Sequence, residues 1–341
     1  MVKHTDKLAT NILEYDKYYH KIKNHSHLFQ EYRNLWEKAS SFEVETSFPI
    51  QIEFELSNAC NFRCGFCPYS FPKNKLPKGF DIPKKDKIMS FELFKKIIDE
   101  GSEKGLMAIE LGYNTEPLIF KKLIDCIKYA KQKNIIDIRM STNGLKLTKE
   151  ISALLIESGL THLNVSFDAF SEETFLKTRA SKHYKKVLQN ALNFLEIRNN
   201  LGNQLPLMRV SFIVTEENKH EKNSFVKFWK DRADLIAVQS LISYDNTPEN
   251  LQNSGNERQK DIVYNCHQPW TRLAIRSNGD IKPCCSIPGM AFSKVNLSET
   301  TITNYWNSKE MKELRNILKV GEGYKNSVCK KCIESIENKN N

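Results

Sequence analysis

Between residues 49 and 241 the chain alternates short apolar runs with longer amphipathic stretches. The short runs are rich in branched and aromatic residues, as strands are, whereas the longer stretches space their apolar residues as helices do. Strands are expected at residues 50–56, 107–111, 136–141, 162–167, 208–214 and 235–241. Helices are expected at residues 91–104, 118–133, 149–158, 184–199 and 219–232. This alternation predicts a parallel sheet with helices outside it.

The number of repeats indicates the fold class. Six strands rather than eight predict an α/β fold, an open partial (βα)6 barrel of the TIM type, over residues 49–244. In such barrels the chemistry gathers at the C-terminal ends of the strands. Residues 1–48 are polar with interleaved aromatic residues, and we expect an N-terminal extension of one or two helices there, packed on the barrel exterior.

A second unit follows a change in composition. Residues 245–260 are rich in Asn, Gln, Glu and Ser and poor in apolar residues, which predicts a linker. Beyond it, an Asn-Gly pair at Gly279, flanked by apolar residues, predicts a β-hairpin, and residues 310–318 predict a helix. We therefore expect a small C-terminal hairpin-and-helix domain over residues 261–335 and a tail over residues 336–341.

Composition narrows the class of protein. Of the 341 residues 40% are hydrophobic, which is enough for a sizeable core. No apolar run approaches the length of a membrane span and the N-terminus has no secretory signal, so we expect a cytoplasmic protein without membrane contact. The net charge is +10, but the lysines are scattered, so no nucleic-acid partner is expected. Nine cysteines in such a chain indicate metal ligation rather than disulfides.

Three of these cysteines follow the first expected strand. The segment reads Cys60-Asn-Phe-Arg-Cys64-Gly-Phe-Cys67, and a loop can turn all three thiolates toward one inorganic body. Thiolates select zinc, copper(I) or iron–sulfur clusters, and three ligands are one short of a closed tetrahedral site. Phe66 is then an apolar lid that keeps water from a cluster. A zinc knuckle and a chance grouping of cysteines are the alternatives.

The spacing of these cysteines resembles the cluster loop of the radical S-adenosylmethionine (SAM) enzymes. The resemblance implies a [4Fe-4S] cluster on Cys60, Cys64 and Cys67 whose open iron binds the amino and carboxylate groups of SAM. It also implies reductive cleavage of SAM to a 5′-deoxyadenosyl radical, so that the cofactors carry the difficult chemistry.

Motifs after the next three strands extend the resemblance. Relatives carry a Gly-Gly-Glu-Pro-like sequence after the second strand, where this chain keeps Glu116 but has Asn114 and Thr115 in place of glycines. The resemblance implies that Glu116 receives the SAM ammonium group, while a Glu that caps the next helix is the alternative. The turn at Ser141 and Asn143 matches the family's Thr-Asn-Gly turn, although an ordinary turn explains it equally well.

The fourth strand ends in Asn-Val-Ser-Phe-Asp, with Ser166 at its centre, and Arg179 follows thirteen residues after this serine. In relatives the matching Ser and Arg hold the ribose and the carboxylate of SAM, and an Arg fork suits a carboxylate. The residues expected to contact the cofactor are therefore Phe66, Asn114, Thr115, Glu116, Ser141, Asn143, Ser166 and Arg179.

Four further cysteines form a second set. Cys266, Cys284, Cys329 and Cys332 stand before, within and after the expected hairpin, the last two as a C-x2-C turn. Four thiolates close either a zinc tetrahedron or a [4Fe-4S] cube, and ligand count alone does not separate them. Segment 266–332 resembles the SPASM/twitch extension of radical SAM enzymes, which implies an auxiliary [4Fe-4S] cluster. One cluster rather than two resembles the arrangement in dehydrogenases of aminocyclitols.

Two cysteines and three other residues remain. Cys126 falls in an expected helix and is read as a small buried hydrophobe, and Cys285 as a packing residue rather than a spare ligand or redox thiol. Tyr69, Tyr113 and His267 lie near the motifs, and the residue that accepts a proton from the substrate cannot be identified among them.

The sequence therefore predicts a radical SAM oxidoreductase. The expected reaction is hydrogen abstraction from a small hydroxylated substrate, such as a sugar or an aminocyclitol, and its oxidation to a carbonyl, with the auxiliary cluster as electron acceptor. An electron donor such as flavodoxin or ferredoxin is the implied partner. A radical SAM enzyme that modifies peptides or proteins is the first alternative, and a non-catalytic iron–sulfur or zinc-binding protein is the second.

Overall fold

The computed structural model describes residues 9–11, 27–71, 87–241, 265–292 and 294–337. Its strands form one ten-stranded sheet in the order β1-β7-β6-β5-β4-β3-β2-β8-β9-β10. The strands are β1 (Ala9–Asn11), β2 (Gln51–Phe54), β3 (Ala108–Leu111), β4 (Asp137–Thr142), β5 (His162–Ser166), β6 (Leu207–Val214), β7 (Leu235–Ser240), β8 (Arg272–Ile275), β9 (Asp280–Lys282) and β10 (Val295–Asn296). The helices are α2 (His27–Ser40), α3 (Phe91–Lys104), α4 (Leu123–Gln132), α5 (Lys149–Ser158), α6 (Glu172–Arg179), α7 (Tyr184–Asn200), α8 (Lys222–Trp229), α9 (Gln268–Thr271), α10 (Ile302–Trp306), α11 (Lys309–Lys319) and α12 (Ser327–Glu337).

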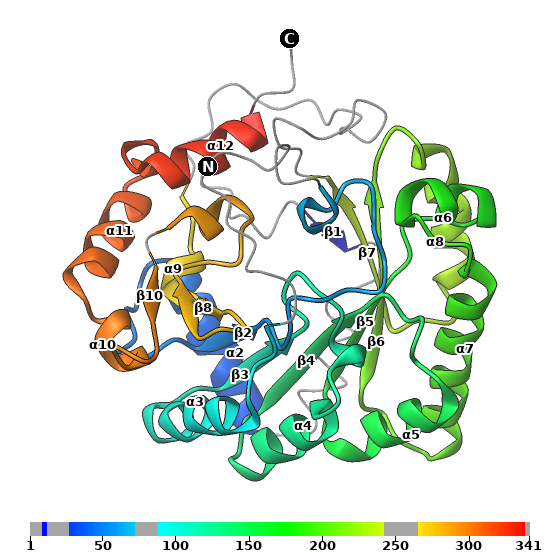
Figure 1. The fold of residues 1–341 in the computed structure, drawn as a ribbon, viewed down its shortest axis with the longest axis horizontal. Helices are drawn as coiled ribbons and strands as arrows, with labels where there is room; N and C mark the ends of the chain where they lie inside the picture. The colour runs from blue at the N-terminus through cyan, green and yellow to red at the C-terminus, as the bar shows by residue number, and fades with distance from the viewer. Residues whose placement is uncertain (1–8, 12–26, 72–86, 242–264, 293, 338–341) are drawn as a thin grey trace.

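Strands β2 to β7 are parallel neighbours and make the partial barrel predicted from the sequence. Helices α3, α4, α5, α7 and α8 lie outside the curved sheet (Figure 1). The six strands lie within two residues of their predicted positions. Three helices differ from the prediction: a short 3-10 turn at Pro117–Ile119 precedes α4, which begins only at Leu123, and α6 was not predicted. The helix expected at residues 219–232 is a 3-10 turn at Lys219–Glu221 followed by the shorter α8.

Local sequence signals fix the ends of the helices. The side chain of Ser90 accepts a hydrogen bond from Leu93 N at the start of α3, and Thr148 does the same for Ile151 N at the start of α5. Gly105 and Gly159 end these two helices with φ angles of 91° and 100°, in the left-handed region that glycine adopts without cost. The Ser90 and Thr148 caps lie in the strand-to-helix connections, on the side of the site, whereas Gly105 and Gly159 lie in the helix-to-strand connections at the other end of the barrel.

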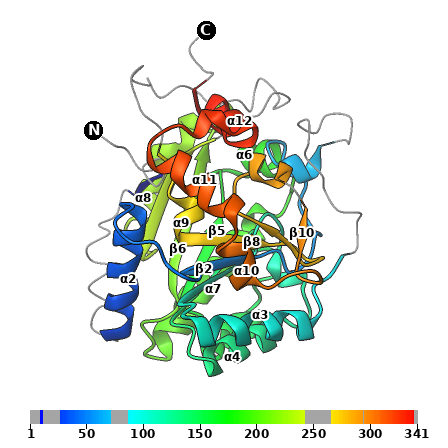
Figure 2. The same cartoon turned by 90° about the vertical axis from the view of Figure 1, so that its left-hand side faces the viewer.

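Helix α2 closes the N-terminal end of the barrel. Its aromatic side chains Phe29, Tyr32 and Trp36 pack with Ile50 and Leu207 at the beginnings of strands. Figure 2 shows α2 beside the sheet, at the left of the view, with α12 at the top. The sequence predicted one or two helices on the barrel exterior; the apolar stripe of α2 finds its partners at the strand beginnings, and the bounds of the proposed N-terminal extension stay a prediction.

The C-terminal segment continues the barrel sheet rather than forming a separate one. Strand β8 pairs parallel with β2, and β9 pairs antiparallel with β8, across the predicted hairpin turn at Gly279. Trp306 Nε1 donates a hydrogen bond of 2.7 Å to Thr46 O, which joins α10 to the segment before β2. The C-x2-C pair lies on helix α12, so the predicted turn at these cysteines was wrong.

The boundaries between the expected domains stay predictions. The linker proposed at residues 245–260 and the end of the proposed tail lie outside the described residues. In the part of the chain that the structure covers, no helix is both long and apolar enough to cross a membrane.

Candidate active site

The first cysteine set lies in the loop that leaves the C-terminal end of β2. Cys64 is buried, and Cys60 and Cys67 are half-buried beside it. The loop closes on itself through a hydrogen bond from Cys67 N to Cys64 O of 3.0 Å, and Gly65 N donates to Thr178 O on α6 at 3.3 Å. All three thiols are therefore held on one loop between β2 and α6, as the spacing predicts.

The surroundings of these thiols fit a bound metal group. Burial raises the pKa of Cys60 and Cys64, and it raises that of Cys67 to about 12, so a free thiolate here is disfavoured. A coordinating metal reverses this preference, because it deprotonates the thiol. Phe66 is buried in the main hydrophobic core, as an apolar group beside such a site would be.

Glu116 joins the segment after β3 to the end of β4. Its Oε1 accepts hydrogen bonds from Thr142 Oγ1 at 2.6 Å and from Leu118 N at 3.0 Å, and its Oε2 accepts one from Asn143 N at 2.7 Å. Burial raises the pKa of Glu116 against the effect of these donors. Glu116 also caps the 3-10 turn that follows it, as the alternative interpretation of this residue predicted. The same carboxylate is the expected ligand of the SAM ammonium group, and the two roles are compatible.

The backbone before Glu116 adopts the conformation that glycines usually supply. Asn114 has a φ angle of 60°, in the left-handed region that asparagine tolerates. At Gly112, with φ 102°, a Cβ atom would lie 2.5 Å from Ser141 O, so only glycine fits. Thr115 Oγ1 donates to Ser57 O at 2.6 Å and so does not point freely into the site. The departure from the family pattern at Asn114 is thus compatible with the same backbone geometry.

Ser166, Asp168 and Arg179 come together at the end of β5. Arg179 donates from Nη1 to Asp168 Oδ2 at 2.9 Å and from Nη2 to Ser166 O at 3.2 Å. Asp168 is fully buried and also accepts a hydrogen bond from Ile213 N at 2.7 Å. The guanidinium carbon of Arg179 lies 5.7 Å from the ring centre of Phe62, in the first cysteine loop. Sequence reasoning missed Asp168 as the partner of Arg179.

Two buried donors of these residues have no hydrogen-bond partner in the described part of the chain: Asn114 Nδ2 and Arg179 Nε. Unpaired buried donors are uncommon in folded proteins and often mark the place of a ligand or water. Asn143 Nδ2 donates to Asn61 Oδ1 at 2.6 Å and lies 4.0 Å from Cys60 Sγ, which places this candidate directly beside the cysteine loop. Ser141 Oγ instead donates to Glu110 Oε1 at 2.8 Å.

The second cysteine set gathers from three elements. Cys266 precedes α9, Cys284 follows β9, and Cys329 and Cys332 lie one helical turn apart on α12. The neighbouring thiols Cys284, Cys329 and Cys332 each help to raise the pKa of Cys266, although burial is the larger cause. Gly289 packs directly against Cys284, because a Cβ atom at position 289 would lie 2.5 Å from Cys284 Sγ. The four predicted ligands therefore face one small region.

Neither set is arranged for a single metal ion. Among the described residues no group of three or more Cys, His, Asp and Glu side chains could hold one ion. Thiolates that share a tetrahedral zinc lie only about 3.8 Å apart, given a zinc–sulfur distance of about 2.3 Å. A four-iron cube is larger and is held at its corners, so its ligands lie farther apart.

The other residues considered from the sequence are mostly packed in the core or hydrogen-bonded to neighbouring side chains. Cys126 is fully buried on α4, which confirms it as a core residue, and His267 is fully buried 6.5 Å from the ring of Trp36. Tyr69 donates to Glu55 Oε2 at 2.7 Å. Cys285 packs against Tyr113 and Met290, and its thiol donates to Gln268 Oε1 at 3.2 Å, which is consistent with a packing role.

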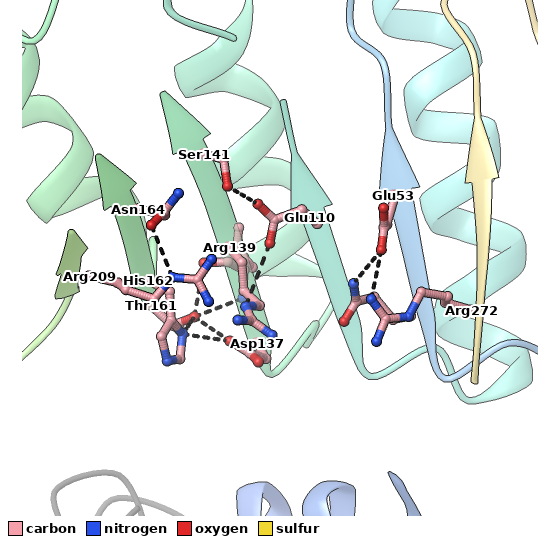
Figure 3. Close-up of polar contacts among 12 residues, drawn as sticks. Glu53, Glu110, Asp137, Arg139, Ser141, Thr161, His162, Asn164, Arg209 and Arg272 are labelled. Carbon is pink, nitrogen blue, oxygen red and sulfur yellow. Dashed lines mark hydrogen bonds and ion pairs between the residues drawn. The ribbon is translucent and has the colours of Figure 1, made fainter. Parts of the chain in front are cut away.

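Charged side chains on the inner face of the sheet were not singled out from the sequence. Glu53 accepts a hydrogen bond of 3.0 Å from Arg272, and Glu110 lies 3.6 Å from Arg139 (Figure 3). The sequence did contain a signal for them, because polar and apolar residues alternate along β2 to β6. A parallel strand that is buried on both faces is apolar throughout, so the alternation indicates one polar face.

Two family models match the chain. A model described as the radical SAM superfamily matches residues 54–219, and a model described as an iron-sulfur cluster-binding domain matches residues 266–333. The first match contains the first cysteine loop and the strand-end residues. The second begins at Cys266 and includes Cys332, so it contains the whole second set.

The curated relatives are GTP 3′,8-cyclases. The chain is 26% identical over 186 residues to that of Limosilactobacillus fermentum, covering 53% of this chain and 50% of the relative. It is 25% identical over 272 residues to that of Petrotoga mobilis, covering 68% and 80%. The chain spans about half the length of the Limosilactobacillus protein and of the Saccharolobus solfataricus protein, at 50% and 51%, and more of the Petrotoga protein.

Solved structures share the fold. BtrN in complex with AdoMet and 2-DOIA has a TM-score of 0.54 at 18% identity, covering 84% of this chain and 93% of that chain. Streptococcus suis SuiB bound to S-adenosylmethionine has a TM-score of 0.57 at 16% identity, covering 81% and 73%. At such identities the likeness concerns the fold and not the reaction.

The relatives contradict the predicted dehydrogenase function. The curated matches are cyclases, which are not sugar or aminocyclitol dehydrogenases. The prediction was inferred from the number of cysteines in the second set. That number fixes how many clusters the chain can hold, but it does not specify which bond of a substrate reacts.

Proposed function

The chain belongs to the radical SAM superfamily and carries an iron–sulfur cluster-binding domain, and on this basis we propose that it cleaves SAM reductively and acts on a small-molecule substrate. Its cofactors are a SAM-binding [4Fe-4S] cluster, an auxiliary cluster and SAM. When bound, the first cluster and SAM together supply a carbon radical that removes hydrogen from a substrate. An external donor such as flavodoxin or ferredoxin provides the electron in this proposal.

The unpaired donors at the strand ends carry the proposal. Asn114 Nδ2 and Arg179 Nε are both buried. Arg179 lies over Phe62 of the first cysteine loop, and the two residues after Asn114 bond to Ser57 O and Ala59 O just before that loop. SAM offers a carboxylate and hydroxyl groups that accept hydrogen bonds. A buried donor that gains such an acceptor recovers the free energy that its desolvation costs. We assign these two donors to SAM, with Ser166 and Asn143 beside them.

Glu116 retains capacity for the ammonium group of SAM. A carboxylate has about four acceptor positions, and Glu116 uses three of them for Thr142, Leu118 and Asn143. Those three contacts also hold the carboxylate in one orientation before SAM arrives, which lowers the entropy lost on binding. Glu116 therefore both fixes the turn after β4 and offers one remaining position to an ammonium donor.

SAM affinity tests this assignment with a matched pair of variants. Asn114→Gly removes the unpaired amide while keeping a residue that accepts the left-handed backbone. Asn134→Gly makes the same change at an exposed asparagine with φ 62°, away from the cysteines. Equilibrium dialysis of SAM with the anaerobically reconstituted protein should show about tenfold weaker binding for Asn114→Gly, the effect of one lost hydrogen bond of about 1.4 kcal/mol, and parental binding for Asn134→Gly. Equal affinity in both variants removes Asn114 from the SAM site.

A further inference from the structure

The inner face of the barrel sheet is charged. On β2, β3, β4, β6 and β8, or one residue beyond them, it carries Glu53, Glu55, Glu110, Asp137, Arg139, Arg209, Arg272 and Arg276, which we call the charged inner face. The alternate residues of the same strands, such as Ile52 and Ile109, are fully buried in the main core. Because successive side chains of a strand point to opposite faces, the apolar set faces the helices and the charged set faces the barrel interior.

Exposure separates two levels of this face. At the beginnings of the strands, Asp137 and His162 have side chains only 3% and 8% exposed and bond to each other at 2.9 Å. Burial lowers the pKa of His162 to about 3, so this ring is neutral. Higher up, the Arg139 and Glu110 side chains are 28% and 19% exposed. Solvent therefore reaches the upper level, while the lower level is part of the closed core.

The charges balance over the described strands. Four carboxylates face four guanidinium groups, so the formal charge of the charged inner face is zero. The ion pairs are Glu53–Arg272 at 3.0 Å, Glu110–Arg139 at 3.6 Å and Glu55–Arg276 at 3.6 Å. Arg209 donates to Asn164 Oδ1 at 2.9 Å and lies close enough to influence the ionisation of Glu110.

The acidic side chains lie between two groups of basic ones, because Arg272 and Arg276 stand on or just beyond β8, the neighbour of β2. Glu53 and Glu110 pair in register on neighbouring strands β2 and β3, while Arg139 and Arg209 lie on β4 and β6. Neighbouring strands are about 4.8 Å apart, so Glu110 on β3 and Arg139 on β4 present an acidic and a basic group within the reach of one small molecule (Figure 3).

We propose that the partly exposed upper level of the charged inner face is the substrate site, and that its substrate is a compact zwitterion of the amino-acid class. The ammonium group binds on the side of Glu53 and Glu110, and the carboxylate binds on the side of Arg139 and Arg209. The proposal rests on the radical SAM activity proposed above, because β3, β4 and β5, which line or adjoin the site, also lead into the SAM residues at their C-terminal ends.

A polyanion such as a nucleoside triphosphate fits this face poorly. Each of the four arginines already faces a carboxylate or an amide oxygen, so the interior has no surplus positive charge to offset several negative ones. An added anion would also meet Glu53, Glu55 and Glu110 in a site of low dielectric, where like charges repel strongly. A zwitterion adds one charge of each sign and so preserves the balance.

The test uses the reconstituted protein with SAM and three kinds of probe: the twenty free amino acids singly, GTP as the polyanion and myo-inositol as the neutral polyol. Binding is first read without reductant, as the shift of the unfolding temperature. The rate of 5′-deoxyadenosine formation is then read after reduction with dithionite. At least one amino acid should raise the unfolding temperature and also raise the rate of 5′-deoxyadenosine formation by tenfold or more. GTP and inositol should raise neither the unfolding temperature nor the rate.

Variants link the response to the named residues. Asn164→Asp adds a negative charge against Arg209 without removing a partner from any ion pair, and should weaken binding of the responding amino acid at least tenfold. Glu110→Gln keeps a group that can accept from Ser141 and should weaken it similarly. Glu173→Gln, in an 80% exposed side chain, is the control and should change nothing.

The outcomes keep the two proposals apart. If the reduced protein forms no 5′-deoxyadenosine at all, the proposed radical SAM activity fails. If it does cleave SAM but no amino acid binds, or only GTP or inositol responds, the zwitterion site is overturned while the SAM activity stands. An amino acid that responds equally in the parent, Asn164→Asp and Glu110→Gln also overturns the site.

Discussion

Arg179→Ala should destabilise the folded chain as well as weaken SAM binding. The substitution leaves Asp168 fully buried and without the guanidinium that lies 2.9 Å from it. Removing one partner of a buried ion pair costs about 3–5 kcal/mol. Loss of a charged hydrogen bond to a ligand costs about 1.5–3 kcal/mol. The effect on folding is the larger of the two. The SAM affinity of this variant alone would therefore reflect both the lost stability and the lost contact with SAM.

A second substitution separates the two effects. In Asp168→Asn/Arg179→Ala the stranded carboxylate becomes neutral, so the free energy of unfolding should recover much of its loss, while SAM affinity stays low. Arg198→Ala is the matched control, because Arg198 forms a similarly buried ion pair with Asp234. This control should lose stability but bind SAM as the parent does.

Urea unfolding of the metal-free chain and equilibrium dialysis of SAM with the reconstituted protein give the two quantities. Parental urea stability of Arg179→Ala would show that the ion pair with Asp168 contributes little to folding. Parental SAM affinity in the double variant would show that Arg179 makes no contact with SAM, and the assignment of its Nε donor would be wrong.

Three further predictions concern the backbone, the core and the second cysteine set. Gly112→Ala should lower stability by about 2 kcal/mol or more, read as a lower unfolding temperature, because the new Cβ would lie 2.5 Å from Ser141 O at a φ of 102°. His162, whose pKa falls to about 3 on folding, should make the chain lose stability as pH drops below about 6.5, its unfolded value, since the unfolded state binds the extra proton. Urea midpoints from pH 7 to pH 4 should show this slope, and His162→Gln should flatten it. Cys329→Ala with Cys332→Ala should reduce bound iron from about eight to about four per chain, measured after anaerobic reconstitution.

Periodicity made the barrel predictable. Strands such as β5 and helices such as α3 repeat their apolar residues at regular spacing, and the signal is local to each segment. The two cysteine sets were also predictable from local sequence, because most of their cysteines lie within a few residues of one another. Helix α6 was missed because Glu172–Arg179 is mainly polar and shows no clear apolar stripe.

Contacts between distant segments could not be predicted. The ion pair of Arg179 with Asp168 and the hydrogen bonds of Glu116 to the turn after β4 have no local sequence signal. Both depend on how the ends of different strands meet in the fold. The position of α2 under the barrel has the same origin. The charged inner face could have been expected from the alternation along β4, where Asp137, Arg139 and Ser141 alternate with the apolar Ile138 and Met140.

Reductive cleavage of SAM by the first cysteine loop is the claim on which the account depends. The reconstituted parent, reduced with dithionite, should form 5′-deoxyadenosine and methionine in equal amounts. Replacing Cys60, Cys64 and Cys67 together by alanine should abolish both products, while the Cys329→Ala/Cys332→Ala variant should retain some cleavage. Equal formation of 5′-deoxyadenosine by the parent and by the triple variant, or none by a parent with its full complement of iron, would contradict the account.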